Sequence, residues 1–452
     1  MNHEEEKKMA LHYNTTSFVN SQTNFFKAHA RKQPTLLGME FEHILIDRDT
    51  LRSYDYFEPD GQKEIFERLM FQGWKPILIE KGQLLGLEKD GDTLTLEPGG
   101  QIEISLRPLS KIIEIDDYYH RVLEDLNSVL KENQVIAGIG YHPVTQIKAL
   151  SLLPKERYGL MYRYFENNGI YCHNMMKGTA ATQVSIDYSD EQDFIKKFRV
   201  ANYLSPVLAS LFDATPFFEG EPVKGANMRL RIWEETDIKR SKLIPGSLDQ
   251  LFGFEDYARY LLNIPPILIY SDGTLIQTEN ERLERLLDTY PLKPSELEHI
   301  QSMVFPDVRL KRYIEIRMPD SLPYPYNISV GAVIKGLFYN TENLEKYYQL
   351  SLSANDSWVI KLNNWLSSGE DSRLTPVEHN AFIQLRKDLL IDAIRALDSE
   401  EARYVKALKE MVDTDTSPMV YMRRTFNRSK EAFVELVDVR RTWEHVGSEI
   451  NR

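Results

Sequence analysis

The sequence is poor in cysteine, because its 452 residues include only Cys172. A single thiol cannot form a disulfide within the chain, and it excludes a zinc site built on several thiolates. No stretch approaches the roughly 18 apolar residues of a membrane-spanning helix, and no apolar signal segment follows the polar N-terminus. We therefore expect a cytoplasmic protein that does not use a membrane.

Positive charge is also in deficit. The chain has 55 Lys and Arg against 68 Asp and Glu, which gives a net charge of −13 at pH 7. Binding to nucleic acid needs a basic surface that displaces counterions from the phosphates. We therefore expect no nucleic-acid partner.

Several common catalytic motifs are missing from the sequence. There is no G-x-x-x-x-G-K-[ST] loop, no G-x-G-x-x-G after a strand, no H-E-x-x-H and no G-x-S-x-G. Any nucleotide would then be held through a metal ion and arginines rather than through a glycine-rich loop.

The clearest positive pattern is the stretch 93–105, which predicts two strands that meet at the corner Pro98-Gly-Gly100. With a period of two, Glu97 and Glu103 lie on the polar side of the two arms, and leucines and isoleucines lie behind them. Two carboxylates beside glycines that permit close approach suit a hard cation such as Mg²⁺ or Mn²⁺. An amphipathic hairpin with solvated glutamates explains the same pattern equally well.

Other predicted strands repeat this alternation and strengthen the cation hypothesis. Like charges on neighbouring positions of one face are unfavourable unless a cation or solvent compensates them. The polar faces of these predicted strands carry Glu40 and Glu42 in 36–46, Gln183 in 182–187, Arg229 and Arg231 in 227–233, and Glu315 with Arg317 in 308–317.

Five carboxylates and several arginines on strand faces favour a site for phosphoryl transfer. The carboxylates would surround Mg²⁺, and the arginines would bind a phosphate or a substrate carboxylate. Scattered, solvated charges remain the alternative interpretation of the same residues.

The remaining segments indicate an α+β protein. Helices are expected over 14–33, 61–71, 115–129 and 190–212, a loop-rich region over 141–181, and an irregular excursion over 265–308. Helical periodicity dominates from about residue 328. We expect a catalytic domain over 14–345, with a helical region over 346–452 packed on it.

Six motifs occur in a fixed order between about residues 36 and 340. They are Gly38-Met-Glu-Phe-Glu42, Leu96-Glu-Pro-Gly-Gly-Gln-Ile-Glu103, Thr182-Gln-Val-Ser-Ile-Asp187, Phe212-Asp-Ala-Thr-Pro-Phe-Phe-Glu-Gly220, Met228-Arg-Leu-Arg-Ile-Trp233 with Thr236, Asp237 and Arg240, and Phe305-Pro-Asp-Val-Arg-Leu-Lys-Arg-Tyr-Ile-Glu-Ile-Arg317. In order and spacing these motifs resemble the plant and proteobacterial type of glutamate–cysteine ligase, a family of carboxylate–amine ligases.

The resemblance implies a glutamine-synthetase-like fold, in which an antiparallel sheet curves into a funnel and helices pack outside. It implies a metal site formed by Glu40, Glu42, Glu97, Glu103 and Glu315. It further implies catalytic roles for Lys311 and Arg317, and substrate or nucleotide binding by Gln183, Arg229, Arg231, Trp233 and Arg240.

The implied reaction uses ATP to join the γ-carboxylate of glutamate to the amine of cysteine through γ-glutamyl phosphate, the first step of glutathione biosynthesis. The implied state is a monomer or a homodimer. The segment 171–176 departs from the family pattern, and the regulatory disulfides of plant members cannot form within one protomer. Cys172 itself is expected to be a packed or partly exposed thiol rather than a nucleophile.

Two other functions stay open. The chain could be a ligase of the same family that joins a different acid or amine. It could also be a non-catalytic protein that binds a metabolite on the same fold.

Overall fold

In the computed structural model, which describes residues 10–225, 227–368, 374–414 and 416–442, an antiparallel nine-stranded sheet is built around β1 (Leu37–Asp47). The strand order is β12-β13-β7-β1-β5-β4-β3-β2, and β6 pairs with the far end of β1. The other strands are β2 (Lys75–Glu80), β3 (Gln83–Lys89), β4 (Asp92–Leu96), β5 (Ile102–Ser105), β6 (Gln134–Ala137), β7 (Thr182–Ile186), β12 (Val308–Leu310) and β13 (Ile314–Ile316).

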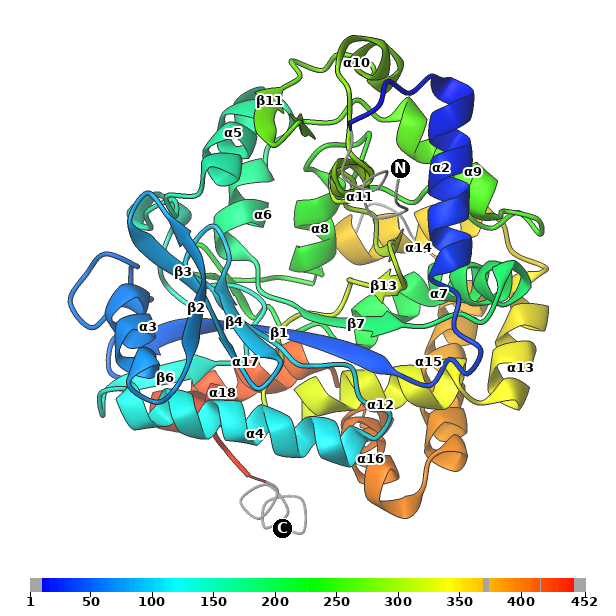
Figure 1. Cartoon of the computed structure of the whole chain (residues 1–452). Coiled ribbons are helices and arrows are strands. Elements are labelled where there is room, and N and C mark those ends of the chain that lie inside the picture. Colours follow the sequence, from blue (N-terminus) through cyan, green and yellow to red (C-terminus); the bar gives the residue numbers. More distant parts are fainter. Residues whose placement is uncertain (1–9, 226, 369–373, 415, 443–452) are drawn as a thin grey trace.

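One face of the sheet is apolar and is covered by helices. Phe41 of β1, Val184 of β7 and Ile314 of β13 are fully buried. Helices α4 (Ile112–Val129) and α12 (Tyr326–Phe338) pack beneath this face, below β1 and β7 in Figure 1. The alternation of apolar and polar residues predicted from the sequence is therefore the alternation between this core and the opposite, polar face.

Helix α12 is buried on all sides because it lies between the sheet and the C-terminal helices. Its glycines allow both contacts to be close: a Cβ at Gly331 would lie 2.5 Å from the sulfur of Met39, and one at Gly336 would lie 2.8 Å from the backbone of Ala393. The C-terminal helices thus reach the sheet mainly through α12.

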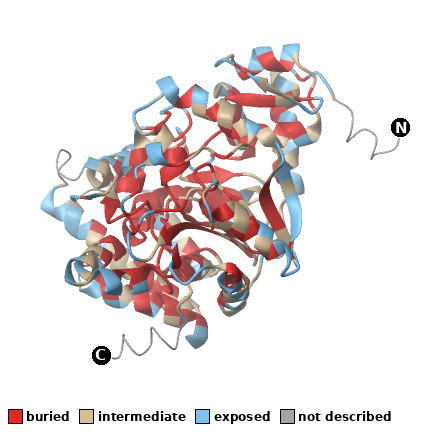
Figure 2. Ribbon diagram, turned by 90° about the vertical axis from the view of Figure 1, so that its left-hand side faces the viewer, coloured by how far each residue is buried: buried red, intermediate tan, exposed pale blue. Residues whose placement is uncertain are grey.

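The C-terminal part is helical, as expected, and Figure 2 shows its buried residues continuous with the interior of the molecule. The expected division at 345/346 falls within α13, and the position of a domain boundary stays a prediction. The helices are α13 (Thr341–Ser351), α14 (Asp356–Ser368), α15 (Pro376–Ala396), α16 (Ser399–Asp413), α17 (Pro418–Arg428) and α18 (Lys430–Val437).

Three short helices stand over the polar face of the sheet, above β1 and β7 in Figure 1. They are α5 (Glu156–Tyr164), α6 (Cys172–Gly178) and α8 (Met228–Glu234), with the 3-10 turns η1 (Ile147–Ala149) and η2 (Phe165–Asn167) nearby. The expectation of a loop-rich region over 141–181 was therefore wrong in part. The two helices there are seven and nine residues long, too short for a helical period to stand out.

The predicted strand over 227–233 is also wrong, because these residues form α8. Asn227 caps the helix, and its side chain accepts a hydrogen bond of 2.8 Å from the amide of Leu230. A run of seven residues that alternates in polarity fits a strand by pattern alone, and the capping asparagine decides for a helix. The stretch 308–317 forms a hairpin, and its turn carries Lys311.

The remaining elements close the molecule around this frame. Helix α2 packs on α9, and α7 packs on α13 and α14. These elements are α2 (Thr15–Ala28), α3 (Gln62–Met70), α7 (Glu191–Leu211), β8 (Phe217–Phe218), β9 (Glu221–Pro222), α9 (Phe254–Asn263), β10 (Leu268–Ser271), β11 (Thr274–Gln277), α10 (Leu283–Thr289) and α11 (Pro294–Gln301).

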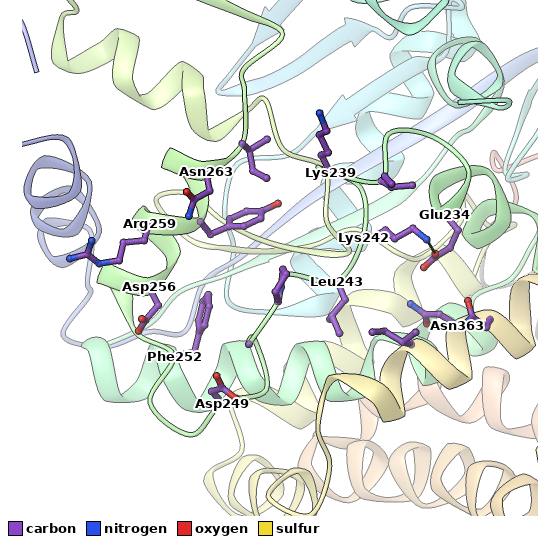
Figure 3. Close-up of a pocket in the computed structure, with 17 residues that line it drawn as sticks. Glu234, Lys239, Lys242, Leu243, Asp249, Phe252, Asp256, Arg259, Asn263 and Asn363 are labelled. Carbon is purple, nitrogen blue, oxygen red and sulfur yellow. Dashed lines mark ion pairs between the residues drawn. The ribbon is translucent and has the colours of Figure 1, made fainter. Parts of the chain in front are cut away.

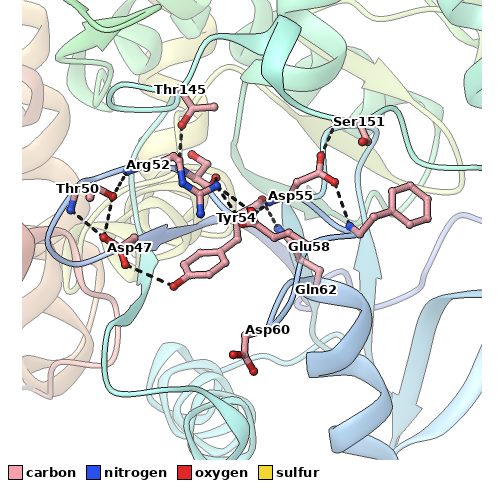
Figure 4. Close-up of polar contacts among 12 residues, drawn as sticks. Asp47, Thr50, Arg52, Tyr54, Asp55, Glu58, Asp60, Gln62, Thr145 and Ser151 are labelled. Carbon is pink, nitrogen blue, oxygen red and sulfur yellow. Dashed lines mark hydrogen bonds and ion pairs between the residues drawn. The ribbon is translucent and has the colours of Figure 1, made fainter.

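The loop that follows β1 is fixed by polar contacts (Figure 4). Asp47 accepts hydrogen bonds from the amide and the hydroxyl of Thr50, at 2.8 and 2.7 Å. The amide of Ser53 donates to Thr145, and the amide of Ser151 donates to Asp55. These bonds hold the segment that leads into α5, whose first turn faces the polar side of the sheet.

The expected α+β class with an antiparallel sheet is confirmed. Within the described ranges, no helix combines the length and the apolar character needed to cross a lipid bilayer.

The close approach of α12 and α15 gives a test of the packing. Gly336→Ala should lower the free energy of unfolding by about 1–3 kcal/mol, because the new methyl group meets the Ala393 backbone, which cannot rotate away. Gly159→Ala in α5 is the matched control, because its Cβ would meet only the tip of Arg163 at 3.8 Å. That variant should be neutral or up to about 1 kcal/mol more stable. Urea unfolding of both variants measures the difference, and equal stability would contradict the tight contact.

Candidate functional site

The register of the strands places the acidic residues on one face of the sheet. Glu42 of β1 lies directly opposite Glu103 of β5, and Glu40 lies directly opposite Gln183 of β7. Glu315 of β13 pairs with Ser185 of β7, two residues further along. Because directly paired residues of antiparallel strands point to the same side, these side chains converge above the sheet.

The corner between β4 and β5 adds the fifth carboxylate. The amide of Gly100 donates to the carbonyl of Glu97 at 2.8 Å, and Gly100 has a φ of +87°, which closes the turn. Gly99 packs so closely on α6 that a Cβ there would lie 2.3 Å from the carbonyl oxygen of Lys177. The predicted Pro-Gly-Gly corner is therefore a contact between the sheet and the helices above it.

A cavity of about 280 Å³ lies between this acidic face and helices α5, α6 and α8. It contains all five predicted carboxylates, so they are not the solvated outer face of a hairpin. The predicted residues that line it are Glu40, Glu42, Glu97, Glu103, Gln183, Arg229, Trp233, Lys311, Glu315 and Arg317.

Three cations surround Glu315. Its carboxylate accepts hydrogen bonds from Arg309 Nε at 2.7 Å, Arg317 Nη1 at 3.0 Å and Lys311 Nζ at 3.3 Å. Burial alone would raise the pKa of Glu315, but these cations together hold it well below its usual range. Glu315 is thus an ionised carboxylate that holds the cations in place.

The other glutamates have too little positive charge around them. Burial, followed by repulsion from Glu103 and Glu315, raises the pKa of Glu40 to about 8. Burial and the charge of Glu97 raise the pKa of Glu103 to about 7. Burial raises the pKa of Glu42 well above its usual range. These carboxylates would lose protons readily to a cation placed among them.

Gln183 connects the acidic and the basic parts of the cavity. Its Nε2 donates to Glu42 Oε1 at 3.0 Å, and its Oε1 accepts a hydrogen bond from Arg317 Nη1 at 2.8 Å. The amide thereby fixes both side chains. Its expected role in binding a ligand stays a prediction.

Of the four predicted residues around α8, two line the cavity and two do not. Arg229 and Trp233 are four residues apart and share a face of the helix, and the arginine carbon Cζ lies 5.7 Å from the centre of the ring. Arg231 is exposed and lies over the ring of Tyr171. The period-two interpretation had placed Arg229 and Arg231 on one face, which the helix excludes.

Arg240 is fully buried away from the cavity. Its guanidinium donates to Asp237 Oδ2 at 2.6 Å, to the carbonyl of Met303 at 2.9 Å and to Tyr164 Oη at 2.8 Å. These bonds join three segments of the chain. This placement favours a structural role over the expected contact with a substrate.

Seven lining residues with polar or charged groups were not predicted: Gln101, Lys155, Arg157, Tyr158, Thr179, Ser302 and Arg309. Arg309 lies in the same hairpin as Lys311 and pairs with Glu315. A hairpin over 308–317, in place of the single strand expected there, would have predicted this pairing. Lys155, Arg157 and Tyr158 precede or begin a helix that the sequence did not reveal.

The carboxylates of Glu40, Glu42, Glu97 and Glu103 fit a hard divalent cation, because they are oxygen donors and burial raises the pKa of each. Across the residues that the structure describes, no three His, Cys, Asp or Glu side chains are grouped closely enough to enclose a metal ion. The glutamates therefore line the cavity without forming a complete coordination sphere, and their role as metal ligands stays a prediction.

Cys172 lies on α6 and is buried. Burial, with a further contribution from Asp237, raises the pKa of the thiol to about 12. A thiol that is protonated at neutral pH is a poor nucleophile, in agreement with the expectation from the sequence.

A larger cavity of about 790 Å³ lies beside α9 and α14 (Figure 3). Its charges are mixed, and one pair, Lys242 and Glu234, is 3.1 Å apart. It has none of the five converging glutamates, so its size alone does not make it the candidate active site.

The raised pKa of Glu40 predicts how stability depends on pH. A carboxyl group whose pKa rises from 4.5 to about 8 on folding destabilises the folded state progressively as the pH rises between these values. In EDTA, Glu40→Gln should leave the melting temperature unchanged near pH 5 and raise it by about 1 °C at pH 8, corresponding to on the order of 1 kcal/mol.

Glu132→Gln, which changes an exposed glutamate, is the control and should alter neither value. Thermal unfolding followed at the two pH values measures the effect. A Glu40→Gln protein that is less stable at pH 8 than the unchanged protein would show that the Glu40 charge is already compensated.

Comparisons with known proteins find relatives over most of the chain. The model of glutamate-cysteine ligase family 2 matches residues 36–438. The chloroplastic glutamate–cysteine ligase of Arabidopsis thaliana is 29% identical over 413 residues, which are 86% of this chain and 76% of the relative. Ligase B of Oryza sativa subsp. japonica is 32% identical over 330 residues, 70% of this chain and 64% of the relative.

The fold has a match among solved structures. The glutamate–cysteine ligase of Francisella tularensis, crystallised with AMP, superposes with a TM-score of 0.53 at 10% identity, covering 93% of this chain and 89% of that one. At this identity the match concerns the fold, and it confirms the expected ligase fold class. Because the family model spans nearly the whole chain, from the first strand of the sheet to the last helix, the chain belongs to glutamate-cysteine ligase family 2.

Proposed function

We propose that this protein is an ATP-dependent ligase that joins the γ-carboxylate of glutamate to the amine of cysteine. The observation that carries the proposal is the buried cavity in which strands of a family 2 ligase bring together five glutamates and a group of cations. A site of this kind binds anions and charged intermediates without a protein nucleophile.

The reaction proceeds in two steps. An oxygen of the substrate γ-carboxylate attacks the γ-phosphorus of ATP, ADP leaves, and an acyl phosphate forms. The neutral amine then attacks the acyl carbon, inorganic phosphate leaves with that oxygen, and the nitrogen loses a proton as the amide forms. The protein contributes positions, charge and exclusion of water that would hydrolyse the acyl phosphate.

The cations beside Glu315 have the main electrostatic role in this scheme. Arg309, Lys311 and Arg317 are fixed by one ionised carboxylate, so they need no reorganisation when a phosphate arrives. Lys311 and Arg317 line the cavity and stabilise negative charge on the transferred group. Arg229 faces the same space and suits a substrate carboxylate.

Glu40, Glu42, Glu97 and Glu103 would hold Mg²⁺ or Mn²⁺, with Glu315 as a further ligand if its cations move. Such an ion supplies positive charge between the two reacting anions. For the nucleotide, the relative from Francisella tularensis was crystallised with AMP, which supports an adenine nucleotide as co-substrate.

Three finer expectations remain proposals. The small-molecule partners are glutamate, cysteine and ATP, and the oligomeric state is a monomer or a homodimer. The expected location is the cytoplasm, whereas the plant relatives are named as chloroplastic proteins.

One experiment tests the function and its mechanism together. Phosphate release from ATP and Mg²⁺ should require both glutamate and cysteine. If another acid–amine pair drives phosphate release in their place, the protein is a different ligase. If no acid–amine pair drives phosphate release, the protein is a metabolite-binding protein. Oxygen-18 in the glutamate γ-carboxylate should appear in the released phosphate, because the acyl phosphate carries that oxygen.

Cys172→Ser is the companion variant of this experiment and should keep most of the activity. Product that forms without label in phosphate, or an inactive but folded Cys172→Ser protein, would contradict the acyl-phosphate scheme and indicate a thioester or an adenylate.

The second prediction compares two arginines. Arg317 faces the cavity, whereas Arg231 is exposed outside it. Arg317→Lys should lower kcat/KM by an amount that corresponds to a loss of on the order of 2–3 kcal/mol of transition-state binding, because an ammonium group cannot form the parallel hydrogen bonds of a guanidinium. Arg231→Lys should change transition-state binding by less than about 0.5 kcal/mol. Steady-state kinetics of both variants decide, and equal effects would remove Arg317 from the site.

A further inference from the structure

The lining of the acidic cavity divides by chemistry according to the elements that supply it. The strands supply the carboxylates, and the helices above them supply three methionines, which are Met161 on α5 with Met175 and Met176 on α6. All three are buried. Methionines at buried helical positions often serve only as core filling, but these three line the same small cavity as the glutamates.

The helices that carry the three methionines form one wall of the cavity, the methionine wall, and it is fixed both to the sheet and between the helices. Gln101 Nε2 donates to the carbonyl of Thr179 at 2.8 Å, just beyond α6. Gly99 packs directly on the backbone of Lys177. The ring of His173 stacks on that of Tyr162 with centres 3.7 Å apart, which joins α6 to α5. The wall is therefore set in place before any ligand binds.

The hydroxyl groups of the helical wall are already engaged within the protein. Thr179 Oγ1 donates to the carbonyl of Met175 at 2.8 Å, and Tyr158 Oη donates to the carbonyl of Leu96 at 3.3 Å. A thioether is only a weak hydrogen-bond acceptor. A ligand hydroxyl placed among the three methionines would lose its water without gaining equivalent partners.

Two cations stand at the start of the same wall. Lys155 and Arg157 line the cavity, and the Nε of Arg157 is buried without a hydrogen-bond partner. Lys155 Nζ lies 4.6 Å from the centre of the ring of Tyr158, which precedes Met161 by three residues. Cations beside apolar side chains match an amino acid, whose carboxylate and side chain lie on the same carbon.

We propose that Met161, Met175 and Met176 form the side-chain pocket of the amine substrate. They select an α-amino acid with a small, uncharged side chain that ends in a thiol or an alkyl group, and they reject one that ends in a hydroxyl. Lys155 and Arg157 bind its carboxylate. This inference rests on the proposed ligase function and names the residues that set the specificity for the amine.

The test compares three amines that differ in one group. L-cysteine, L-2-aminobutyrate and L-serine carry SH, CH₃ and OH at the same position. With glutamate and ATP, the unchanged protein should use 2-aminobutyrate with a kcat/KM roughly 10- to 100-fold above that for serine, the range for a hydroxyl without partners in an apolar pocket.

Met176→Gln keeps an unbranched side chain of similar length and adds an amide that can bond the hydroxyl. It should reduce the preference for 2-aminobutyrate over serine by about five- to tenfold. Met176→Leu keeps the pocket apolar and should hold the ratio within about threefold. Met70→Gln changes an exposed methionine outside the cavity and is the control for the substitution itself.

Folding is checked by circular dichroism, and Met175→Gln and Met161→Gln replace Met176→Gln if that protein does not fold. An unchanged 2-aminobutyrate-to-serine ratio in folded glutamine variants that still use cysteine would overturn the methionine pocket and leave the ligase function standing. An unchanged protein that releases phosphate with none of the three amines would overturn the ligase function with cysteine instead.

Discussion

The site depends on the register of the antiparallel strands, because this register places like charges face to face. Glu42 lies opposite Glu103, and Glu40 lies between two neighbouring strands on the same side. Desolvated carboxylates in this arrangement repel one another. The surrounding side chains compensate in part: Thr95 and Ser105 donate to Glu103, and the amide of Ala181 donates to Glu42. Protons on these carboxyl groups, or a cation bound in the cavity, can supply the rest of the compensation.

The Pro-Gly-Gly corner connects this charged face with the helices above it. The carbonyl of Pro98 accepts a hydrogen bond from the amide of Leu153, at 3.0 Å, and Gly99 packs on the backbone of Lys177. The same turn therefore positions Glu97, the segment that leads into α5, and the end of α6. A side chain at Gly99 would separate all three, which explains why the sequence has a glycine where the hairpin alone does not need one.

The strands were predicted well from the sequence because successive side chains of a strand point to opposite faces, so a sheet with one apolar face gives a two-residue period of polarity. Prediction from the sequence therefore found Glu40, Glu103 and Glu315 together. It failed for α8, where seven residues fit either period, and for Arg240, whose partners come from distant segments. Met175 and Met176 gave no signal, because a methionine that lines a cavity cannot be told from one in a core without the coordinates.

The separation of carboxylates on strands from methionines on helices has a consequence for how this protein can diverge. A substitution on α6 alters the surface that meets the amine, and it leaves the paired strands and their charges untouched. Preference for the amine can therefore change by single mutations while the chemistry of activation is inherited intact. A substitution on β1 or β5 has no such freedom, because each residue there also fixes the register of its neighbours.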